Sequence, residues 1–329
     1  MWKSGPALAC GNTMVFKPAE QTPLTALKLA EIYKEAGMPD GVFNVVQGAR
    51  ETGSALISHK DVSKVTLTGS VDTGKVVMAH SAKDLKKVTL ELGGKSPIVV
   101  FDDANIDNAI NGILAANFYS TGQICSNGTR VFAHQDIYEN LIERLAERAN
   151  GMKIGNPFDE STDMGPLVTA EHFEKVKRYM QIAKDSKARH VCGGDTLTDP
   201  SLEGGYYVSP AIFADCTDDM EFVEDEVFGP LLSIMPFTDE NTVVERANST
   251  DFGLSGAVFT EDFSRAHRVA NRIQAGIVWI NEYNVTPAEI PFGGYKQSGI
   301  GRENGLQAIE HYTQLKTIYA NLGDIPQLY

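Results

Sequence analysis

The sequence contains few cysteines, and they are widely separated. Its 329 residues include four, which are Cys10, Cys125, Cys192 and Cys216. None belongs to a Cys-x-x-Cys pair or has a histidine at metal-ligand spacing, which argues against a structural zinc site. A disulfide scaffold is not expected at this length and cysteine density. The pattern favours a reducing compartment, and we expect a cytoplasmic protein.

Positive charge and long apolar runs are also scarce. Lysine and arginine number 29 against 43 aspartate and glutamate residues, which gives a net charge of −14. Nucleic acids and anionic membranes both require clustered positive charge, so neither is an expected partner. The apolar runs at 98–101 and 276–280 have the length of a strand rather than of a membrane span, and no secretory signal is recognised. The expected partner is a small molecule.

Strand and helix patterns alternate along residues 1–150. Short runs rich in β-branched residues predict strands at 13–17, 42–46, 62–67, 88–92, 98–101 and, later, 277–280. Segments with helical spacing of apolar residues predict helices at 24–36, 53–59, 74–82, 106–119, 137–149, 170–184 and 263–274. This alternation predicts an α/β fold with a parallel sheet covered on both faces, and the length favours two domains.

The segment 122–130 contains the most informative cysteine. It places Cys125 among small, polar, turn-forming residues rather than inside an apolar run, and Glu91 occurs earlier in the segment 90–97. A thiol nucleophile with a carboxylate that acts as its base is the equipment of covalent acyl chemistry. A lone cysteine is more often a small buried hydrophobic residue. These residues alone leave both interpretations open.

Two segments follow predicted strands, at the sheet edge where α/β proteins bind ligands. In the segment 16–20, Lys17 and Glu20 could each hydrogen-bond ribose hydroxyls, and a carboxylate there would repel a 2′-phosphate, which favours NAD over NADP. A solvated turn is the alternative. The segment 68–74 opens a helix whose N–H groups can hold a pyrophosphate. Its Gly-x-x-x-x-Gly spacing matches neither the dinucleotide fingerprint nor the Walker A motif.

Two later segments are typical of fixed turns. Glu226 is followed by Val-Phe-Gly-Pro at the end of the acidic segment 218–226, for which a solvated loop is the alternative. The segment 291–303 combines several glycines with aromatic residues. Backbone of that composition is expected to approach another chain segment or a ligand closely.

Six of these segments, in this order, resemble the aldehyde dehydrogenase superfamily. They are Phe16-Lys17-Pro18-Ala19-Glu20, Thr68-Gly69-Ser70, Leu90-Glu91-Leu92-Gly93-Gly94-Lys95-Ser96, Gly122-Gln123-Ile124-Cys125, Glu226-Val227-Phe228-Gly229-Pro230 and the glycine-rich run ending at Glu303. The resemblance covers essentially the whole chain. It implies a Rossmann-like parallel-sheet cofactor domain over residues 1–92, incomplete at its N-terminus, and an α/β catalytic domain over 93–298. A C-terminal return and oligomerisation tail would occupy 299–329, so a homo-oligomer, dimer or tetramer, is expected.

The resemblance also implies a mechanism. The Cys125 thiolate attacks the aldehyde carbon, and its backbone N–H and a side-chain amide hold the oxyanion. Hydride passes to NAD, and Glu91 activates the water that hydrolyses the thioester. The implied cofactor-binding residues are Lys17, Pro18, Ala19 and Glu20 near the adenosine ribose, Gly69 and Ser70 near the pyrophosphate, and Gly93, Glu226 and Phe228 near the nicotinamide. NADP stays open as an alternative cofactor.

Residues 125–132 and 287–291 are similar to the bacterial betaine aldehyde branch of this family. The similarity implies oxidation of betaine aldehyde to glycine betaine, an osmoprotectant made from choline. Trp2 and Phe292 match positions near the substrate, where aromatic faces attract a quaternary ammonium, although Phe292 fits core packing equally well.

Two further sets of positions carry roles by this resemblance alone. Lys3 and Glu303 match a charge relay of the betaine aldehyde branch. A potassium site shared between subunits is matched by Leu85, Lys296 and Gly299.

The family's sequence begins well before Trp2 and includes an asparagine that donates to the oxyanion. Loss of one such donor typically costs about a hundred- to a thousandfold in rate, so we expect this chain to be nearly inactive by itself. Two other interpretations stay open. One is a dehydrogenase for another aminoaldehyde, such as trimethylaminobutyraldehyde, and the other is a non-catalytic protein derived from a dehydrogenase.

Overall fold

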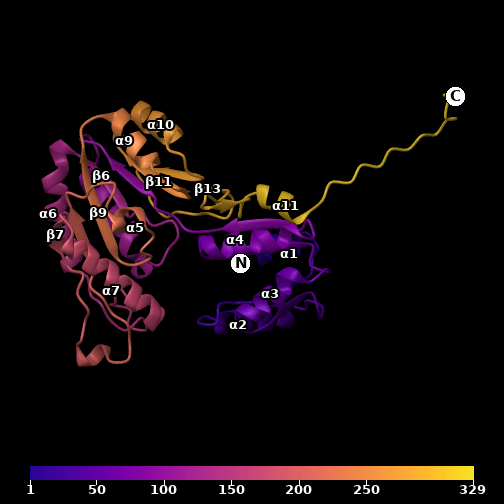
Figure 1. Cartoon of the computed structure of the whole chain (residues 1–329), viewed down its shortest axis with the longest axis horizontal. Helices are drawn as coiled ribbons and strands as arrows, with labels where there is room; N and C mark the ends of the chain where they lie inside the picture. The colour runs from indigo at the N-terminus through magenta and orange to yellow at the C-terminus, as the bar shows by residue number, and fades with distance from the viewer.

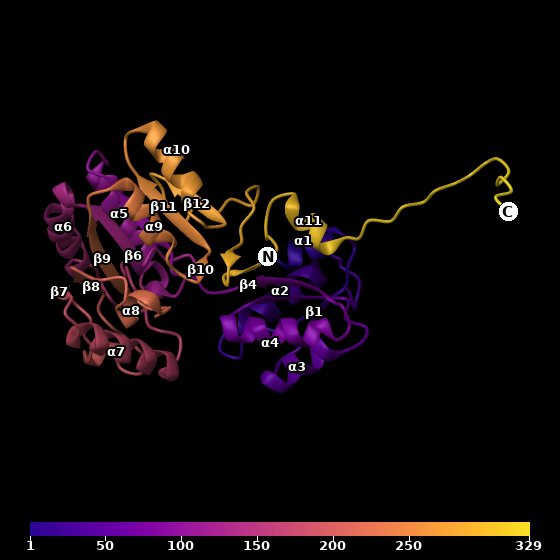
Figure 2. The same ribbon diagram turned by 45° about the horizontal axis from the view of Figure 1, so that its top comes forward.

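Two lobes lie side by side, and an extended C-terminal segment projects away from the smaller one (Figure 1). The computed structural model describes residues 1–329 apart from the side chain of Ser201. The chain forms most of the smaller lobe first, then the larger lobe, and then returns to the smaller lobe (Figure 2). None of the helices in this described part is long and apolar enough to cross a lipid bilayer.

The smaller lobe contains two short parallel sheets with helices around them. Its elements are α1 (Ser4–Ala9), β1 (Met14–Phe16), α2 (Leu24–Glu35), β2 (Phe43–Val45), α3 (Arg50–Ser58), β3 (Lys64–Thr68), α4 (Val71–Ala82), β4 (Lys87–Glu91), β14 (Gly299–Ile300) and α11 (Gln307–Tyr312). β1 pairs with β2, and β3 pairs with β4. The returning strand β14 adds to β4 in antiparallel fashion, with Gly299 opposite Glu91.

The larger lobe is built on a seven-stranded sheet. Its strands are β5 (Pro97–Val100), β6 (Arg130–His134), β7 (Arg189–Cys192), β8 (Ala211–Ala214), β9 (Leu231–Phe237), β11 (Ser255–Phe259) and β12 (Ile277–Ile280). Its helices are α5 (Ile106–Phe118), α6 (Tyr138–Asn150), α7 (Ala170–Asp185), α8 (Glu221–Glu224), α9 (Glu240–Asn248) and α10 (Phe263–Arg272). Short pieces are η1 (Tyr119–Gly122), η2 (Gln135–Ile137), η3 (Pro200–Leu202), β10 (Phe252–Gly253) and β13 (Tyr295–Lys296).

The strand order is β12-β11-β5-β6-β9-β8-β7, and every pair except β7–β8 is parallel. Helices cover both faces of this sheet. On β5, Ile98 and Val100 pack into the core under α5 and α6, whereas Val99 packs into the core under α7, α9 and α10. The predicted α/β class and the parallel sheet covered on both faces are confirmed.

An open groove separates the two sheets of the smaller lobe. Among the described residues, β1 pairs only with β2, and β3 pairs only with β4, so each keeps an unpaired edge. The groove is lined from both sides, by Val15 and Phe16 of β1 and by Val65 and Leu67 of β3. Unpaired edges with apolar neighbours favour association with other chains.

Most predicted elements lie within a few residues of the observed ones. The helices α3 and α4 begin at Arg50 and Val71 rather than at Gly53 and Gly74. The patterns did not predict the helices α1, α8, α9 and α11 or the strands β6, β7, β8, β9, β10, β11, β13 and β14. Strands buried on both faces are continuous apolar runs, and periodicity alone does not separate such runs from helix.

Candidate active site

Cys125 lies in a tightly constrained loop between η1 and β6. Three consecutive residues before it, Ser120, Thr121 and Gly122, have positive φ angles of 53°, 59° and 71°. A Cβ on Gly122 would lie 2.3 Å from the backbone carbon of Gly229, so the loop packs directly against the segment 226–230. Only glycine permits this approach.

The backbone after Cys125 is fixed by side chains from the sheet. The Ser126 carbonyl accepts hydrogen bonds from the Tyr283 hydroxyl at 2.7 Å and from the Ser255 hydroxyl at 3.0 Å. The amide nitrogens of Asn127 and Asn284 donate to the carbonyls of Gly122 and Ala115. Both amides therefore have carbonyl partners, and the backbone N–H groups of Ser126 and Cys125 are hydrogen-bond donors close to the thiol.

Glu91 ends β4 with a buried carboxylate. The residue is 3% exposed, and neither carboxylate oxygen has a hydrogen-bond partner among the described residues. A Cβ on Gly293 would lie 2.9 Å from Oε1, so the glycine-rich segment closes over the carboxylate. Burial raises the pKa of Glu91 to about 8, with Lys3 opposing the shift and Glu303 adding to it. A carboxyl group that titrates near neutral pH is suited to general base catalysis.

The Cys125 thiol lies within the electrostatic reach of two carboxylates. Burial raises its pKa to about 11, the negative charges of Glu91 and Glu226 add to the shift, and the backbone N–H groups of Ser126 and Cys125 oppose it. Cys125 is therefore a neutral thiol at pH 7, and its attack requires removal of the proton.

Glu226 reaches the same place from a third segment. Its Oε1 accepts a hydrogen bond from the Gly94 N–H at 2.9 Å, and a Cβ on Gly93 would lie 2.4 Å from its Oε2. A Cβ on Gly94 would lie 2.4 Å from the Cys125 carbonyl oxygen. Burial raises the pKa of Glu226 as well. The turn Gly93-Gly94 thus brings Glu91, Cys125 and Glu226 together.

The expected ribose residues lie at the carboxyl end of β1, on the groove. Lys17 Nζ donates to the carbonyls of Pro18 at 2.8 Å and Gly48 at 2.9 Å. Pro18 is buried, whereas Ala19 and Glu20 are exposed. All four line the groove. The lysine therefore has a structural role in addition to the expected one, because it joins β1 to the loop that precedes α3.

The second expected cofactor segment follows β3. Ser70 is the N-cap of α4 and accepts a hydrogen bond from the Thr73 N–H at 3.2 Å. The Gly69 N–H donates to the Glu91 carbonyl at 3.1 Å, which ties this turn to the end of β4. A helix start at the carboxyl ends of parallel strands is a favourable place for phosphate groups.

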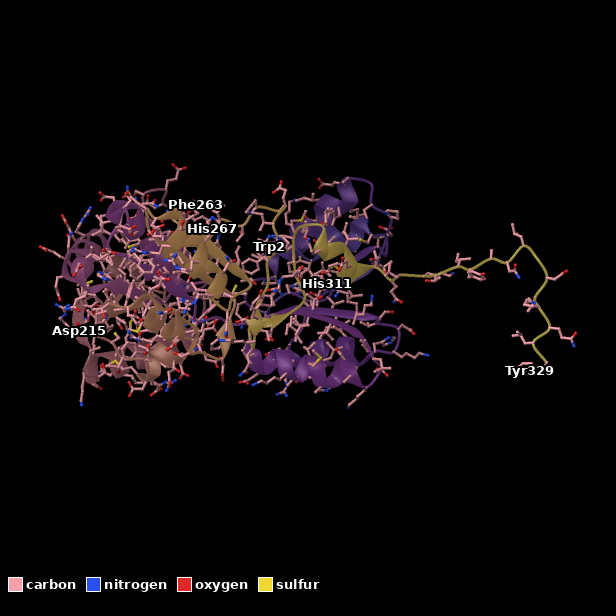
Figure 3. All side chains as sticks on the ribbon, turned by 90° about the horizontal axis from the view of Figure 1, so that it is seen from above. Trp2, Asp215, Phe263, His267, His311 and Tyr329 are labelled. Carbon is pink, nitrogen blue, oxygen red and sulfur yellow. The ribbon has the colours of Figure 1, made fainter. Side chains whose placement is uncertain are left out.

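Trp2 lies at the junction of the two lobes (Figure 3). Its ring centroid is 5.0 Å from that of Phe292, and the two rings are tilted. Trp2 is 39% exposed, whereas Phe292 is buried. Beside them, Lys3 Nζ is 2.5 Å from Glu303 Oε1, and the Glu303 side chain is fully buried. The structure brings these four expected residues together next to Glu91.

The three expected potassium positions are separated within one chain. Leu85 precedes β4 and is 91% exposed, whereas Gly299 pairs with Glu91 at the opposite end of that strand. Lys296 Nζ donates to the carbonyls of Asn248 and Thr250. One chain therefore does not assemble these positions into a single ligand set, and the potassium site stays a prediction.

Sequence patterns missed several residues that hold the site. Lys95 is fully buried and donates to two carbonyls of the segment that leads to Glu226. His172 and Lys175 of α7 donate to the Phe228 and Glu226 carbonyls. The sequence offered one signal, which is that Lys95 lies just before the wholly apolar strand β5. Charged residues are almost never fully buried unless they are paired, so a lysine at that position is expected to have partners.

The comparisons with known proteins agree with this geometry. The profile of the aldehyde dehydrogenase family matches residues 1–318. A betaine aldehyde dehydrogenase of Brucella anthropi is 56% identical over 100% of this chain and 67% of its own length. One from Brucella ovis is 55% identical with the same coverage. The chain thus spans about two thirds of the length of these relatives.

Solved structures give the same result. An aldehyde dehydrogenase from Bacillus cereus, determined as an NAD+ complex, is 46% identical, with a TM-score of 0.95 over 98% of this chain and 65% of its own length. A betaine aldehyde dehydrogenase from Staphylococcus aureus in complex with NAD+ is 40% identical, with a TM-score of 0.92 over 94% of this chain and 62% of its own.

Proposed function

The chain belongs to the aldehyde dehydrogenase family, and on this premise we propose that it oxidises betaine aldehyde to glycine betaine with NAD as hydride acceptor. One observation carries the proposal. A buried carboxyl group without hydrogen-bond partners among the described residues, Glu91, lies within the electrostatic reach of the Cys125 thiol. A buried polar group without hydrogen-bond partners is costly whether or not it is ionised, so the presence of this carboxyl group beside a thiol favours a catalytic role.

The proposed reaction begins at Cys125. The thiol gives its proton to the Glu91 carboxylate, its sulfur forms a bond to the aldehyde carbon, and the carbonyl electron pair moves to oxygen next to the Cys125 N–H. Glu91 would pass this proton on toward Lys3 and Glu303 and become ionised again. If Glu226 and Phe228 hold NAD as proposed below, the cofactor would supply the acceptor for the hydride of that carbon, which would then be a thioester bonded to Cys125. Glu91 then removes a proton from water, the water oxygen bonds to the acyl carbon, and the carbon–sulfur bond breaks. The products are the carboxylic acid and the free thiol.

The residues present fit the cofactor. The absence of a Cβ at Gly93 leaves room for the Glu226 carboxylate at the floor of the site, where it could bind the nicotinamide ribose. Phe228 would position the nicotinamide ring. Lys17, Pro18, Ala19 and Glu20 line the open groove at the end of β1, where the adenosine ribose would bind. Gly69 and Ser70 at the start of α4 would hold the pyrophosphate. The exposed Glu20 carboxylate favours NAD over NADP because it would repel a 2′-phosphate.

Lys3 and Glu303 would carry the proton away from Glu91. The buried Glu303 carboxylate contacts Lys3, and both charges act on the pKa of Glu91. Thr66 also approaches Glu303 Oε1, at 3.4 Å. The potassium positions Leu85, Lys296 and Gly299 would need a neighbouring subunit to complete a site, and the homo-oligomer itself is part of this proposal.

Trp2 and Phe292 would recognise the quaternary ammonium of the substrate. Replacement of Trp2 with alanine is expected to raise the KM for betaine aldehyde by about two- to thirtyfold, the range of a cation–π contact. Trp2→Phe should retain most of the affinity. The measurement is the KM, with the uncharged tert-butyl analogue of the aldehyde as a matched substrate. If Trp2→Ala weakens both substrates equally, the aromatic pair has a packing role only.

Hydrolysis of the thioester is expected to accelerate as pH rises through about 8. Only the ionised carboxylate of Glu91 accepts a proton from water, and its pKa is about 8. A single-turnover measurement of acid release from about pH 6 to pH 10 tests this, because the curve should level off above the Glu91 pKa. Alkylation of Cys125 should keep rising toward its own pKa of about 11. A hydrolysis rate independent of pH would contradict the assignment of Glu91.

The overall proposal is tested by NADH formation from three aldehydes, with enough protein to detect the low rate that is expected of this chain by itself. Betaine aldehyde should give a higher kcat/KM than trimethylaminobutyraldehyde and acetaldehyde. A preference for the longer aminoaldehyde would change the substrate but keep the reaction. Failure of Cys125 to form an adduct with any aldehyde, together with an absence of NADH, would contradict the dehydrogenase function.

A further inference from the structure

One face of α7 lies along the turn formed by residues 225–229, here called the Glu226 turn. The contacts come from His172, Lys175, Val176 and Tyr179. Residues three, four and seven positions apart share one face of a helix. The helix is long, and its start is capped by Thr169, which accepts a hydrogen bond from the His172 N–H.

Each of these side chains contacts a different residue of the turn. The Tyr179 hydroxyl donates to Asp225 Oδ2 at 2.7 Å, and Lys175 Nζ donates to the Glu226 carbonyl at 2.8 Å. His172 Nε2 lies 2.7 Å from the Phe228 carbonyl oxygen, so this nitrogen carries the hydrogen. For these three hydrogen bonds, a donor nearer the start of α7 contacts a residue further along the turn.

The last contact is steric. A Cβ on Gly229 would lie 2.7 Å from Val176 Cγ2, so the helix packs directly on the turn backbone. The opposite side of Gly229 faces the nucleophile loop, because a Cβ on Gly122 would lie 2.3 Å from its carbonyl carbon. The Glu226 turn is therefore held between α7 and the loop that carries Cys125.

Lys95 secures the same turn from beneath. Its Nζ donates to the Phe222 carbonyl at 2.8 Å and to the Asp225 carbonyl at 2.6 Å. The side chain is completely buried, so its charge is compensated only by these dipoles and by nearby carboxylates. Two charge-assisted hydrogen bonds from one buried lysine restrain the backbone that leads into the Glu226 turn.

The turn requires such support. Phe228 has φ +60°, an unfavourable conformation for a residue that is not glycine. Glu226 holds a buried carboxylate near the thiol of Cys125, and the two repel when both are ionised.

We propose that α7, through Lys175 and His172, is the positioning element that holds Glu226 and Phe228 in the geometry that binds NAD. Lys175 and His172 are positioning residues, since each contacts a backbone carbonyl of the turn and neither contacts the reacting atoms. The inference rests on the proposed function, because Glu226 and Phe228 are assigned to the nicotinamide side of the cofactor there.

The test compares Lys175→Met with Lys177→Met in the full chain. Lys177 lies on the same helix but pairs with Glu174 at the surface, so its loss controls for removal of a lysine from α7. Two readouts are used: the dissociation constant for NAD by titration, and hydrogen–deuterium exchange of residues 222–229 without cofactor. Lys175→Met should raise the dissociation constant about tenfold and speed exchange in this segment, as expected when a charge-assisted hydrogen bond is lost.

Lys177→Met should change neither quantity, and Lys175→Arg should restore both, because arginine keeps a cationic donor. Circular dichroism verifies that Lys175→Met retains its fold, and His172→Leu supplies a second variant with the same expected result. If Lys175→Met leaves hydrogen–deuterium exchange unchanged, or speeds exchange without changing the affinity for NAD, the positioning role of α7 is overturned. The proposed function is not affected by either result. If the unmodified chain does not bind NAD, the cofactor assignment of the proposed function fails, and the positioning role fails with it.

Discussion

Replacement of Cys125 with alanine is expected to lower aldehyde oxidation by about 10⁴-fold or more, because the covalent route is lost entirely. NADH formation measures the rate. Mass spectrometry after aldehyde treatment measures the adduct on the protein, which should disappear in this variant.

Cys10→Ala is the matched control for this experiment. Cys10 is a half-buried thiol that follows α1 in the smaller lobe, and no catalytic role is assigned to it. Its replacement should leave both the rate and the adduct unchanged. If Cys125→Ala retains the rate of oxidation or the adduct, or if Cys10→Ala loses both, the wrong thiol has been identified.

Replacement of Glu91 with glutamine is expected to slow hydrolysis of the thioester by about 10²- to 10⁴-fold, because glutamine is nearly isosteric but cannot accept the proton from water. Formation of the thioester at Cys125 should be affected less, so the acyl group should accumulate on the protein. A single-turnover experiment would show NADH released in a burst, with a stable increase in protein mass. Glu289→Gln removes an exposed carboxylate and serves as the control.

The same variant tests the environment of Glu91 without relying on catalysis. The pKa of Glu91 in the folded chain is about 8, above its ordinary value of 4.5. The folded state therefore binds this proton more tightly than the unfolded state, and the stabilising contribution of the proton is lost as pH rises through the folded pKa. Glu91→Gln should melt at a higher temperature than the unmodified chain near pH 9, with the difference shrinking near pH 5. An equal difference at both pH values would contradict the buried, unpaired carboxylate.

The interpretation of the site from sequence rested on local features. The small polar surroundings of Cys125 marked it as a loop thiol, and the segment 226–230 was recognisable as a turn. These inferences succeeded because turn chemistry depends on a few adjacent residues. The expected positions of Lys3, Glu303, Trp2 and Phe292 came from resemblance, and the structure places them side by side.

Other properties could not be predicted from local patterns. The hydrogen bonds of Lys95 join residues that are far apart in the chain, and those of Lys17 to Gly48 depend on how β1 meets the next loop. The predicted strands also missed β9 and β11, which lie in the middle of the large sheet. Their apolar runs carry no period that distinguishes a doubly buried strand from a helix.

The sequence by itself determined the alternation of strands and helices and the α/β class, because these follow from residue type and short-range spacing. Local patterns left the roles of the candidate thiol and carboxylates open, and those roles were inferred from the resemblance of six segments to a known family. Tertiary structure alone decided how these groups act. It buried Glu91 without a partner, which raised its pKa, and it set the Glu226 turn between α7 and the Cys125 loop. Burial and close approach are properties of segments brought together from distant parts of the chain, so no local pattern contains them.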